Sequence, residues 1–175
     1  MSRTIIKLFF YLCILTALPS YAQNAVHYYF KTMDIRNGLS QNTVYQILQD
    51  RKGFMWFGTK DGLNRYDGLS YRVYKKENSG LGKNFITALY EDHEGNIWIG
   101  TDGGVFIYNP VLDSFTVFNQ TSDKGTVIKD FVTMIGSDEY DNIWISVENQ
   151  GLFCYNHEKR LWNYLHDSGM SNVAR

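Results

Sequence analysis

Three stretches of this chain repeat one pattern: Phe54-Met-Trp-Phe-Gly-Thr59, Asn96-Ile-Trp-Ile-Gly-Thr101 and Asn142-Ile-Trp-Ile-Ser-Val147. Their tryptophans are 42 and 46 residues apart. An acidic turn comes before each stretch, and it begins with an aspartate: Asp50, Asp92 and Asp138. A glycine and then a tyrosine follow each stretch: Gly62 and Tyr66, Gly104 and Tyr108, Gly151 and Tyr155. The chain is therefore built from an internal repeat.

A repeat of about 40–45 residues with many short β segments indicates the blades of a β-propeller. Within residues 44–75, glycine and aspartate turns separate four such segments, at 44–48, 54–59, 63–66 and 71–74. This pattern predicts an antiparallel meander. The same division predicts further blades at 86–119 (strands 86–90, 96–101, 105–108 and 115–118) and 130–165 (strands 132–135, 142–147, 152–155 and 161–165). We expect an all-β fold of four-stranded antiparallel blades.

The second segment of each repeat is apolar on both faces, because residues such as Ile97 and Ile99 flank the tryptophan and point away from it. Stacked blades bury both faces of a strand. We therefore expect Trp56, Trp98 and Trp144 to be structural core residues, with sugar stacking as the weaker alternative. Gly58 and Gly100 share the tryptophan's face and leave room for a bulky neighbour; Ser146 is the small residue of the third repeat.

Both ends of the repeat array are incomplete. A closed ring normally needs four to eight blades. Residues 27–31 resemble a fourth strand without the preceding three, and residues 169–173 repeat the segment 38–44 that leads into the first blade. We expect unpaired strands near 27–31 and 172–175, and we interpret residues 23–175 as an incomplete propeller of about three blades.

The first 22 residues are typical of a signal peptide. Arg3 and Lys7 are followed by the apolar run 8–18 and by a small-x-small cleavage site that ends at Ala22. Export would remove Cys13 and leave Cys154 as the one thiol, so no intrachain disulfide is expected. The formal net charge is −1 with scattered lysines and arginines, which argues against contact with nucleic acid.

The segment 38–44, Gly-Leu-Ser-x-Asn-x-Val, followed by the Asp-x-x-Gly-x-x-Trp-x-Gly-Thr core, resembles the two-component regulator propeller repeat. The third repeat departs from it at Asp141, Ser146 and Val147. The resemblance implies the periplasmic sensor of a bacterial hybrid two-component system, whose parent lies in the inner membrane and is a dimer. It further implies a second propeller, a membrane span and a histidine kinase outside this chain, an oligosaccharide ligand and control of glycan-use genes.

Antiparallel blades place the turns between second and third strands on the same face as the loops that lead into each blade. Polar residues in those positions are candidates for hydrogen bonds to sugar hydroxyls, with ordinary turn formation as the alternative. The candidates are Lys60, Asp61, Lys83, Asn84, Asp102, Glu148, Asn149 and Gln150. The acidic turns at Asp50, Asp92 and Asp138 belong to the opposite face, resemble the aspartate-box hairpins of sialidase-type propellers, and are expected to be structural.

Two classes of function follow. The first is a sensor module with no enzymatic activity of its own, no cofactor and no metal. The alternative is a carbohydrate-active propeller enzyme, a glycosidase or lyase, with its catalytic groups in blades outside this chain. An enzyme needs an acid and a base that converge on the central channel. The middle of the inner strands contains residues such as Tyr45, Thr87 and Thr133 and no carboxylate, which favours the sensor.

Overall fold

The computed structural model describes residues 28–156 and 158–165 of the chain. The chain divides into two compact units, Met1–Thr32 and Met33–Arg175. The second unit contains the regular secondary structure of the described residues, which consists of a short 3-10 helix, η1 (Ile35–Asn37), and twelve strands. The described fold is therefore all-β, as the sequence predicts.

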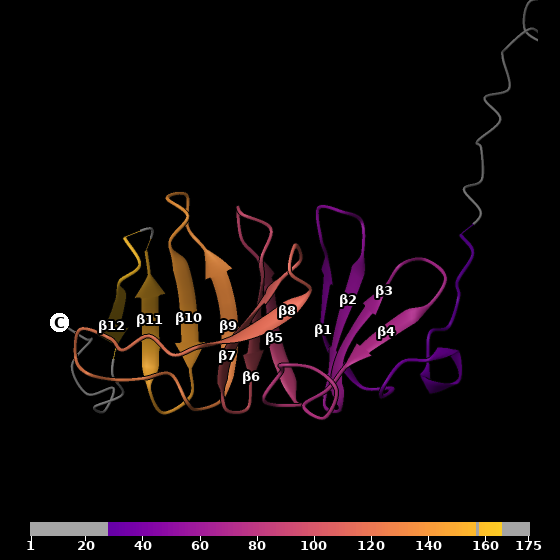
Figure 1. The fold of residues 1–175 in the computed structure, drawn as a ribbon, viewed down its shortest axis with the longest axis horizontal. Coiled ribbons are helices and arrows are strands. Elements are labelled where there is room, and N and C mark those ends of the chain that lie inside the picture. Colours follow the sequence, from indigo (N-terminus) through magenta and orange to yellow (C-terminus); the bar gives the residue numbers. More distant parts are fainter. Residues whose placement is uncertain (1–27, 157, 166–175) are drawn as a thin grey trace, which may run out of the picture. The chain divides into compact units, whose positions relative to one another are not determined.

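The strands form three separate four-stranded antiparallel sheets, each in chain order (Figure 1). The first contains β1 (Val44–Gln49), β2 (Met55–Thr59), β3 (Gly62–Tyr66) and β4 (Tyr71–Tyr74). The second contains β5 (Ile86–Glu91), β6 (Ile97–Thr101), β7 (Gly104–Asn109) and β8 (Ser114–Phe118). The third contains β9 (Val132–Ser137), β10 (Ile143–Val147), β11 (Gly151–Tyr155) and β12 (Leu161–Leu165). The three predicted blades are confirmed, with strand ends that differ from the prediction by at most 2 residues.

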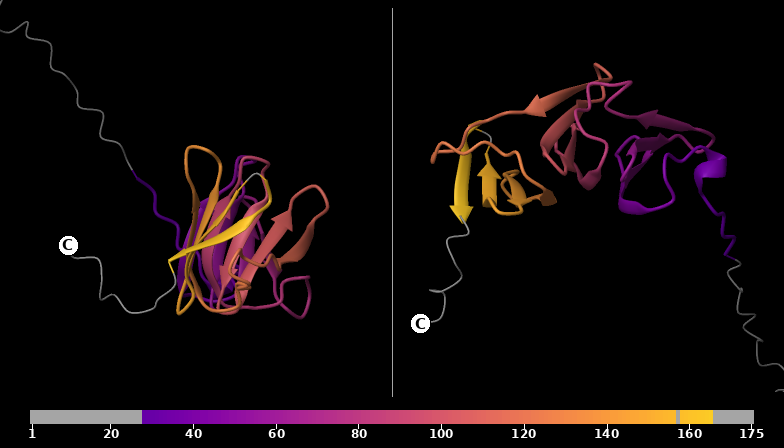
Figure 2. Two further views of the ribbon diagram at one scale, coloured as in Figure 1. Left: turned by 90° about the vertical axis from the view of Figure 1, so that its left-hand side faces the viewer. Right: turned by 90° about the horizontal axis from the view of Figure 1, so that it is seen from below.

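The three blades follow one another without closing a ring (Figure 2). Their first strands contact each other, β1 against β5 and β5 against β9. One core cluster lies between the first two blades and includes Trp56, Leu63 and Ile86. The other lies between the second and third blades and includes Trp98, Val132 and Ile145. Each blade is thus stabilised mainly by the apolar side chains that it shares with its neighbour.

The glycines of the second strands allow this close stacking. A Cβ atom on Gly58 would lie 2.8 Å from Ile86 Cγ2, and one on Gly100 would lie 2.7 Å from Val132 Cγ1. Ile86 and Val132 are the first residues of β5 and β9. The first residue of each following blade therefore packs against the glycine of the blade before it.

The tryptophans follow the same geometry. Trp56 and Trp98 are 1% and 3% exposed, and each lies between two blades. Trp144 is half-buried on the face of the third blade that points away from the second. Burial of the tryptophan thus comes from the following blade as well as from its own sheet, and Trp56 and Trp98 belong to the two core clusters.

The strand predicted at 27–31 is not observed. Residues 28–31 have no regular secondary structure and are exposed. A strand is assigned from the hydrogen bonds of a ladder, and none is assigned to residues 28–31. Position 27, the second predicted strand at 172–175 and the predicted signal peptide at 1–22 lie outside the described residues.

Candidate functional site

One edge of the blades is formed by the β2–β3, β6–β7 and β10–β11 turns together with the loops that lead into each blade, residues 38–43, 80–85 and 126–131. We call this edge the lead-in face. The Gly62 amide donates to the carbonyl of Asn84 at 2.7 Å, and the Glu148 amide donates to the carbonyl of Phe131 at 2.8 Å. These contacts confirm that the two kinds of loop lie together, as the sequence predicts.

The threonine that ends the second strand shapes the turn on this face. The Thr59 hydroxyl donates to the Gly62 carbonyl at 2.9 Å and accepts from the Asp61 amide at 3.0 Å. Thr101 repeats both contacts with Gly104 and Gly103. The Gly-Thr pair of the repeat therefore has two separate roles, since the glycine admits the next blade and the threonine closes the turn.

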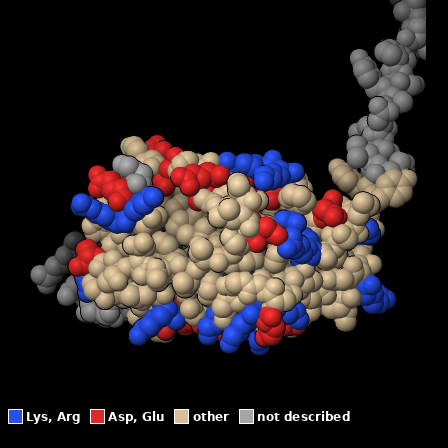
Figure 3. Space-filling view, viewed as in Figure 1, with Lys and Arg blue, Asp and Glu red and all other residues tan. Residues whose placement is uncertain are grey.

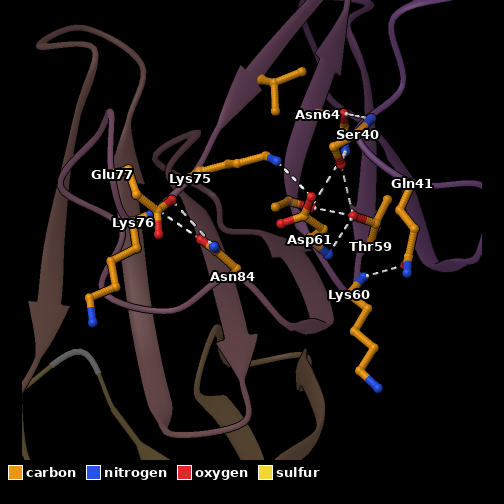
Figure 4. Close-up of polar contacts among 12 residues, drawn as sticks. Ser40, Gln41, Thr59, Lys60, Asp61, Asn64, Lys75, Lys76, Glu77 and Asn84 are labelled. Atoms are coloured by element: carbon orange, nitrogen blue, oxygen red, sulfur yellow. Dashed lines mark hydrogen bonds and ion pairs between the residues drawn. The ribbon is translucent and has the colours of Figure 1, made fainter. Parts of the chain in front are cut away.

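Two of the predicted ligand-binding residues are engaged in holding a loop (Figure 4). The Asp61 carboxylate accepts from Lys75 Nζ at 2.6 Å. The Asn84 side chain accepts from the Lys76 amide at 2.7 Å and donates to Glu77 Oε2 at 3.4 Å. Both side chains stabilise the segment that connects the first two blades, as expected of loop-forming residues.

Gln150 is also engaged, and its predicted role as a ligand-binding residue is not supported. The side chain is 7% exposed. Its Oε1 accepts from the amides of Lys129 and Asp130 at 3.0 and 3.1 Å, and its Nε2 donates to the carbonyl of Val127 at 2.9 Å. The third repeat has Val147 in place of the threonine and one more residue in this turn, and Gln150 braces the lead-in loop instead.

The other five candidates have side chains that are available to a ligand. All five are exposed, and among the described residues none of their side chains takes part in a hydrogen bond or ion pair: Lys60, Lys83, Asp102, Glu148 and Asn149. In Figure 4 the Lys60 side chain extends away from the polar network around Thr59. The structure thus divides the predicted set into residues that build the lead-in face and residues that are exposed on it.

The opposite edge, which we call the aspartate face, contains the β1–β2, β5–β6 and β9–β10 turns. Asp92 Oδ1 accepts from the amides of Glu94 and Asn96 at 3.0 and 2.8 Å, and its Oδ2 accepts from Trp98 Nε1 at 2.8 Å. Asp50 and Asp138 make the corresponding contacts in their own blades. Each aspartate therefore fixes its own hairpin and accepts a hydrogen bond from the indole of its blade.

Arg51 adds a contact between neighbouring turns on the aspartate face. Its Nε lies 2.8 Å from Glu91 Oε1, and its guanidinium donates to the carbonyl oxygens of Asp92 and His93. Charged side chains gather along both turn edges of the blades, and the wall between them is mostly uncharged (Figure 3). Arg51 thus joins the turns of the first two blades.

The hydrogen bonds to Asp138 give a pH prediction. Donation by Asn142 and Trp144 lowers the pKa of the Asp138 carboxyl from its usual 3.8 to about 2. Because the folded-state pKa is the lower one, this group stabilises the fold above pH 3.8, and the contribution is lost as the pH falls through about 2. We expect the Trp144 indole N–H resonance to titrate with a midpoint near pH 2 in NMR spectra. A midpoint near pH 4 would contradict the contact.

One group on the lead-in face was not among the predicted site residues. The Tyr45 and Phe85 ring centroids are 4.8 Å apart, and those of Phe85 and Phe131 are 5.6 Å apart. We call these three rings the aromatic row. Phe85 and Phe131 each stand directly before a first strand, and Tyr45 is the bulged residue of β1. The phenylalanine repeated before two first strands could have indicated part of this group from the sequence. The position of the Tyr45 ring depends on the bulge.

The sequence profile of the two component regulator propeller family matches residues 38–61 and 80–103, which run from the lead-in loop to the β2–β3 and β6–β7 turns. The extracellular domain of a putative hybrid two component system from B. thetaiotaomicron has a TM-score of 0.68 and 29% identity over 77% of this chain. This chain carries two-component regulator propeller repeats.

Other relatives agree with this assignment. Histidine kinase P4 of Formosa agariphila is 42% identical over 59 residues, which are 34% of this chain. The extracellular domain of a putative one component system from B. thetaiotaomicron has a TM-score of 0.63 and 29% identity over 73% of this chain. The propeller repeats of this chain span 4% of the kinase and 18–20% of the two solved domains. Within the described residues, no helix is long and apolar enough to span a membrane.

Proposed function

We propose that this chain is part of the ligand-sensing region of a two-component receptor, exported to the periplasm, and that the ligand is an oligosaccharide. The observation that carries the proposal is a group of five exposed polar side chains on the lead-in face, none of which is used in a hydrogen bond or ion pair among the described residues. On the lead-in face, Lys60, Lys83, Asp102, Glu148 and Asn149 are exposed, and they include hydrogen-bond donors and acceptors suited to sugar hydroxyls.

The proposal extends to parts of the receptor outside this chain. Further blades would pack against the first and third blades, and the resemblance to this family implies a membrane-bound histidine kinase in the same receptor. We infer an inner-membrane parent that acts as a dimer, with a second propeller. The kinase activity would belong to that parent, and the present chain would bind ligand without catalysing a reaction.

A binding experiment tests the proposal. Isothermal titration of the chain with cellohexaose, xylohexaose, mannohexaose and hexagalacturonate should reveal saturable binding to at least one of them. Lys83→Ala should weaken that binding by about 5–30-fold, because loss of a hydrogen bond from a charged donor costs about 1–2 kcal/mol. The matched control is Lys52→Ala, which removes an exposed lysine from the aspartate face and should leave the dissociation constant unchanged.

The outcomes also separate the sensor from the enzyme. A folded chain that binds none of the four hexasaccharides, or equal weakening by the two lysine variants, would contradict the proposal. Release of new reducing ends from a bound hexasaccharide would favour the propeller enzyme instead. Binding without bond cleavage is the expected result for a sensor module.

A further inference from the structure

The aromatic row of Tyr45, Phe85 and Phe131 is not part of the blade cores. Neither core cluster contains any of the three rings. Tyr45 is 47% exposed, and Phe85 and Phe131 are half-buried. By contrast, Trp56, Trp98 and Phe153 are each at most 3% exposed. Scattered apolar residues on a surface are ordinary, but these three rings contact one another across three blades, with interplanar angles of 59° and 83°, and each remains partly exposed, which indicates a contact with another molecule.

The same position on the first strand is irregular in each blade. The pairing register shifts at Tyr45 in β1, at Thr87 in β5 and at Thr133 in β9. Such bulges redirect a side chain and are frequent beside functional sites. The bulge brings the Tyr45 ring to Phe85 of the next blade, at a centroid distance of 4.8 Å. The bulge therefore places the Tyr45 ring, whereas Phe85 and Phe131 are placed by the ends of the loops that lead into β5 and β9.

Polar groups lie beside the rings. Lys60 Nζ is 5.8 Å from the centroid of the Phe85 ring, within the range of a cation–π contact. The Tyr45 hydroxyl makes no hydrogen bond to the described residues. The row thus combines apolar ring faces with a cationic donor and a hydroxyl at its edge. Ligand sites commonly have this composition, with aromatic lining and a few polar groups that fix orientation.

We propose that the aromatic row is the platform on which successive sugar rings of the oligosaccharide stack, with Lys60 and the Tyr45 hydroxyl bonding to the sugar hydroxyls. This inference rests on the proposed function and assigns its ligand to a particular place. A pyranose ring has an apolar C–H face and polar edges. The aromatic rings of the row can pack against the apolar C–H face of the sugar. Lys60 and the Tyr45 hydroxyl can bond to the hydroxyl groups at its polar edges.

The experiment uses the hexasaccharide that the chain binds most tightly among cellohexaose, xylohexaose, mannohexaose and hexagalacturonate. Phe85→Ala and Phe131→Ala should each weaken binding about tenfold, the size expected when an aromatic contact is lost. Phe85→Trp should retain binding, because it keeps a ring at the same place. Leu69→Ala is the control, since Leu69 is 94% exposed in the β3–β4 turn. Tyr45→Phe should weaken binding less than Tyr45→Ala, which separates the hydroxyl from the ring.

The readout includes contacts as well as affinity. Saturation-transfer NMR should show the aromatic protons of Phe85 and Phe131 close to the sugar C–H protons. If a hexasaccharide binds and the two phenylalanine variants bind as tightly as the unmodified chain, the row is not the site, although the proposed function stands. If no hexasaccharide binds, the proposed function is contradicted, and the sugar platform is contradicted with it. If only an apolar peptide contacts the row, the sugar platform is also overturned.

Discussion

Trp98→Ala is expected to reduce the free energy of unfolding of the chain by about 3–5 kcal/mol, the usual loss for a buried large aromatic side chain. Trp98 is 3% exposed, and its ring packs against those of Phe118 and Tyr155 at centroid distances of 5.2 and 5.6 Å. The substitution would leave a cavity between the second and third blades. It would also remove the indole donor to Asp92. Urea unfolding followed by circular dichroism measures the loss.

Trp144→Ala is the matched control for this prediction. It removes the same side chain and the same kind of indole bond, to Asp138 at 3.0 Å, but from a half-buried position on the third blade. The loss should therefore be clearly smaller than for Trp98. Equal losses, or a loss below about 1 kcal/mol for Trp98→Ala, would show that burial between blades is not what stabilises the indole.

The blades could be predicted from the sequence because their turns and strands are determined by residues close together in the chain. Glycine and aspartate mark the turns, and the two-residue period of the strands places Trp98 and Gly100 on one face. The close approach of Val132 to Gly100 follows from that face and from stacking, without any knowledge of coordinates. The structural role of Asp92 follows from its place in a tight acidic turn.

The rest depends on contacts between residues far apart in the chain. Asp61, Asn84 and Gln150 are polar residues of the kind that bind ligands, but their side chains stabilise loops. This role becomes visible only when their hydrogen-bond partners, 8 to 21 residues away in the chain, are known. Tyr45 joins the aromatic row through a register shift in β1, and no local sequence pattern marks that shift. The strand predicted at 27–31 has β-forming residues, yet a strand needs a partner to pair with.

Gly100→Val is expected to cost about 3 kcal/mol of unfolding free energy, at the upper end of the range for overpacking a core. A Cβ at this position would lie 2.7 Å from Val132 Cγ1 and 2.9 Å from Ala88 Cβ. Both neighbours belong to first strands, so the added side chain would push β9 away from β6 and open the second core cluster. Urea unfolding monitored by tryptophan fluorescence reports the change.

Two further variants test whether the close approach of Val132 causes the loss of stability in Gly100→Val. Gly136→Val introduces the same side chain in β9, where no atom lies within 4 Å of the added Cβ, and should cost far less. Val132→Ala removes atoms that the new valine would meet, so combining it with Gly100→Val should recover about 1 kcal/mol relative to the sum of the single losses. Recovery should be partial because Ala88 remains. If the losses of the two single variants simply add in the double variant, Gly100 is needed for the backbone conformation of β6. The contact with Val132 would then not determine the spacing of the blades.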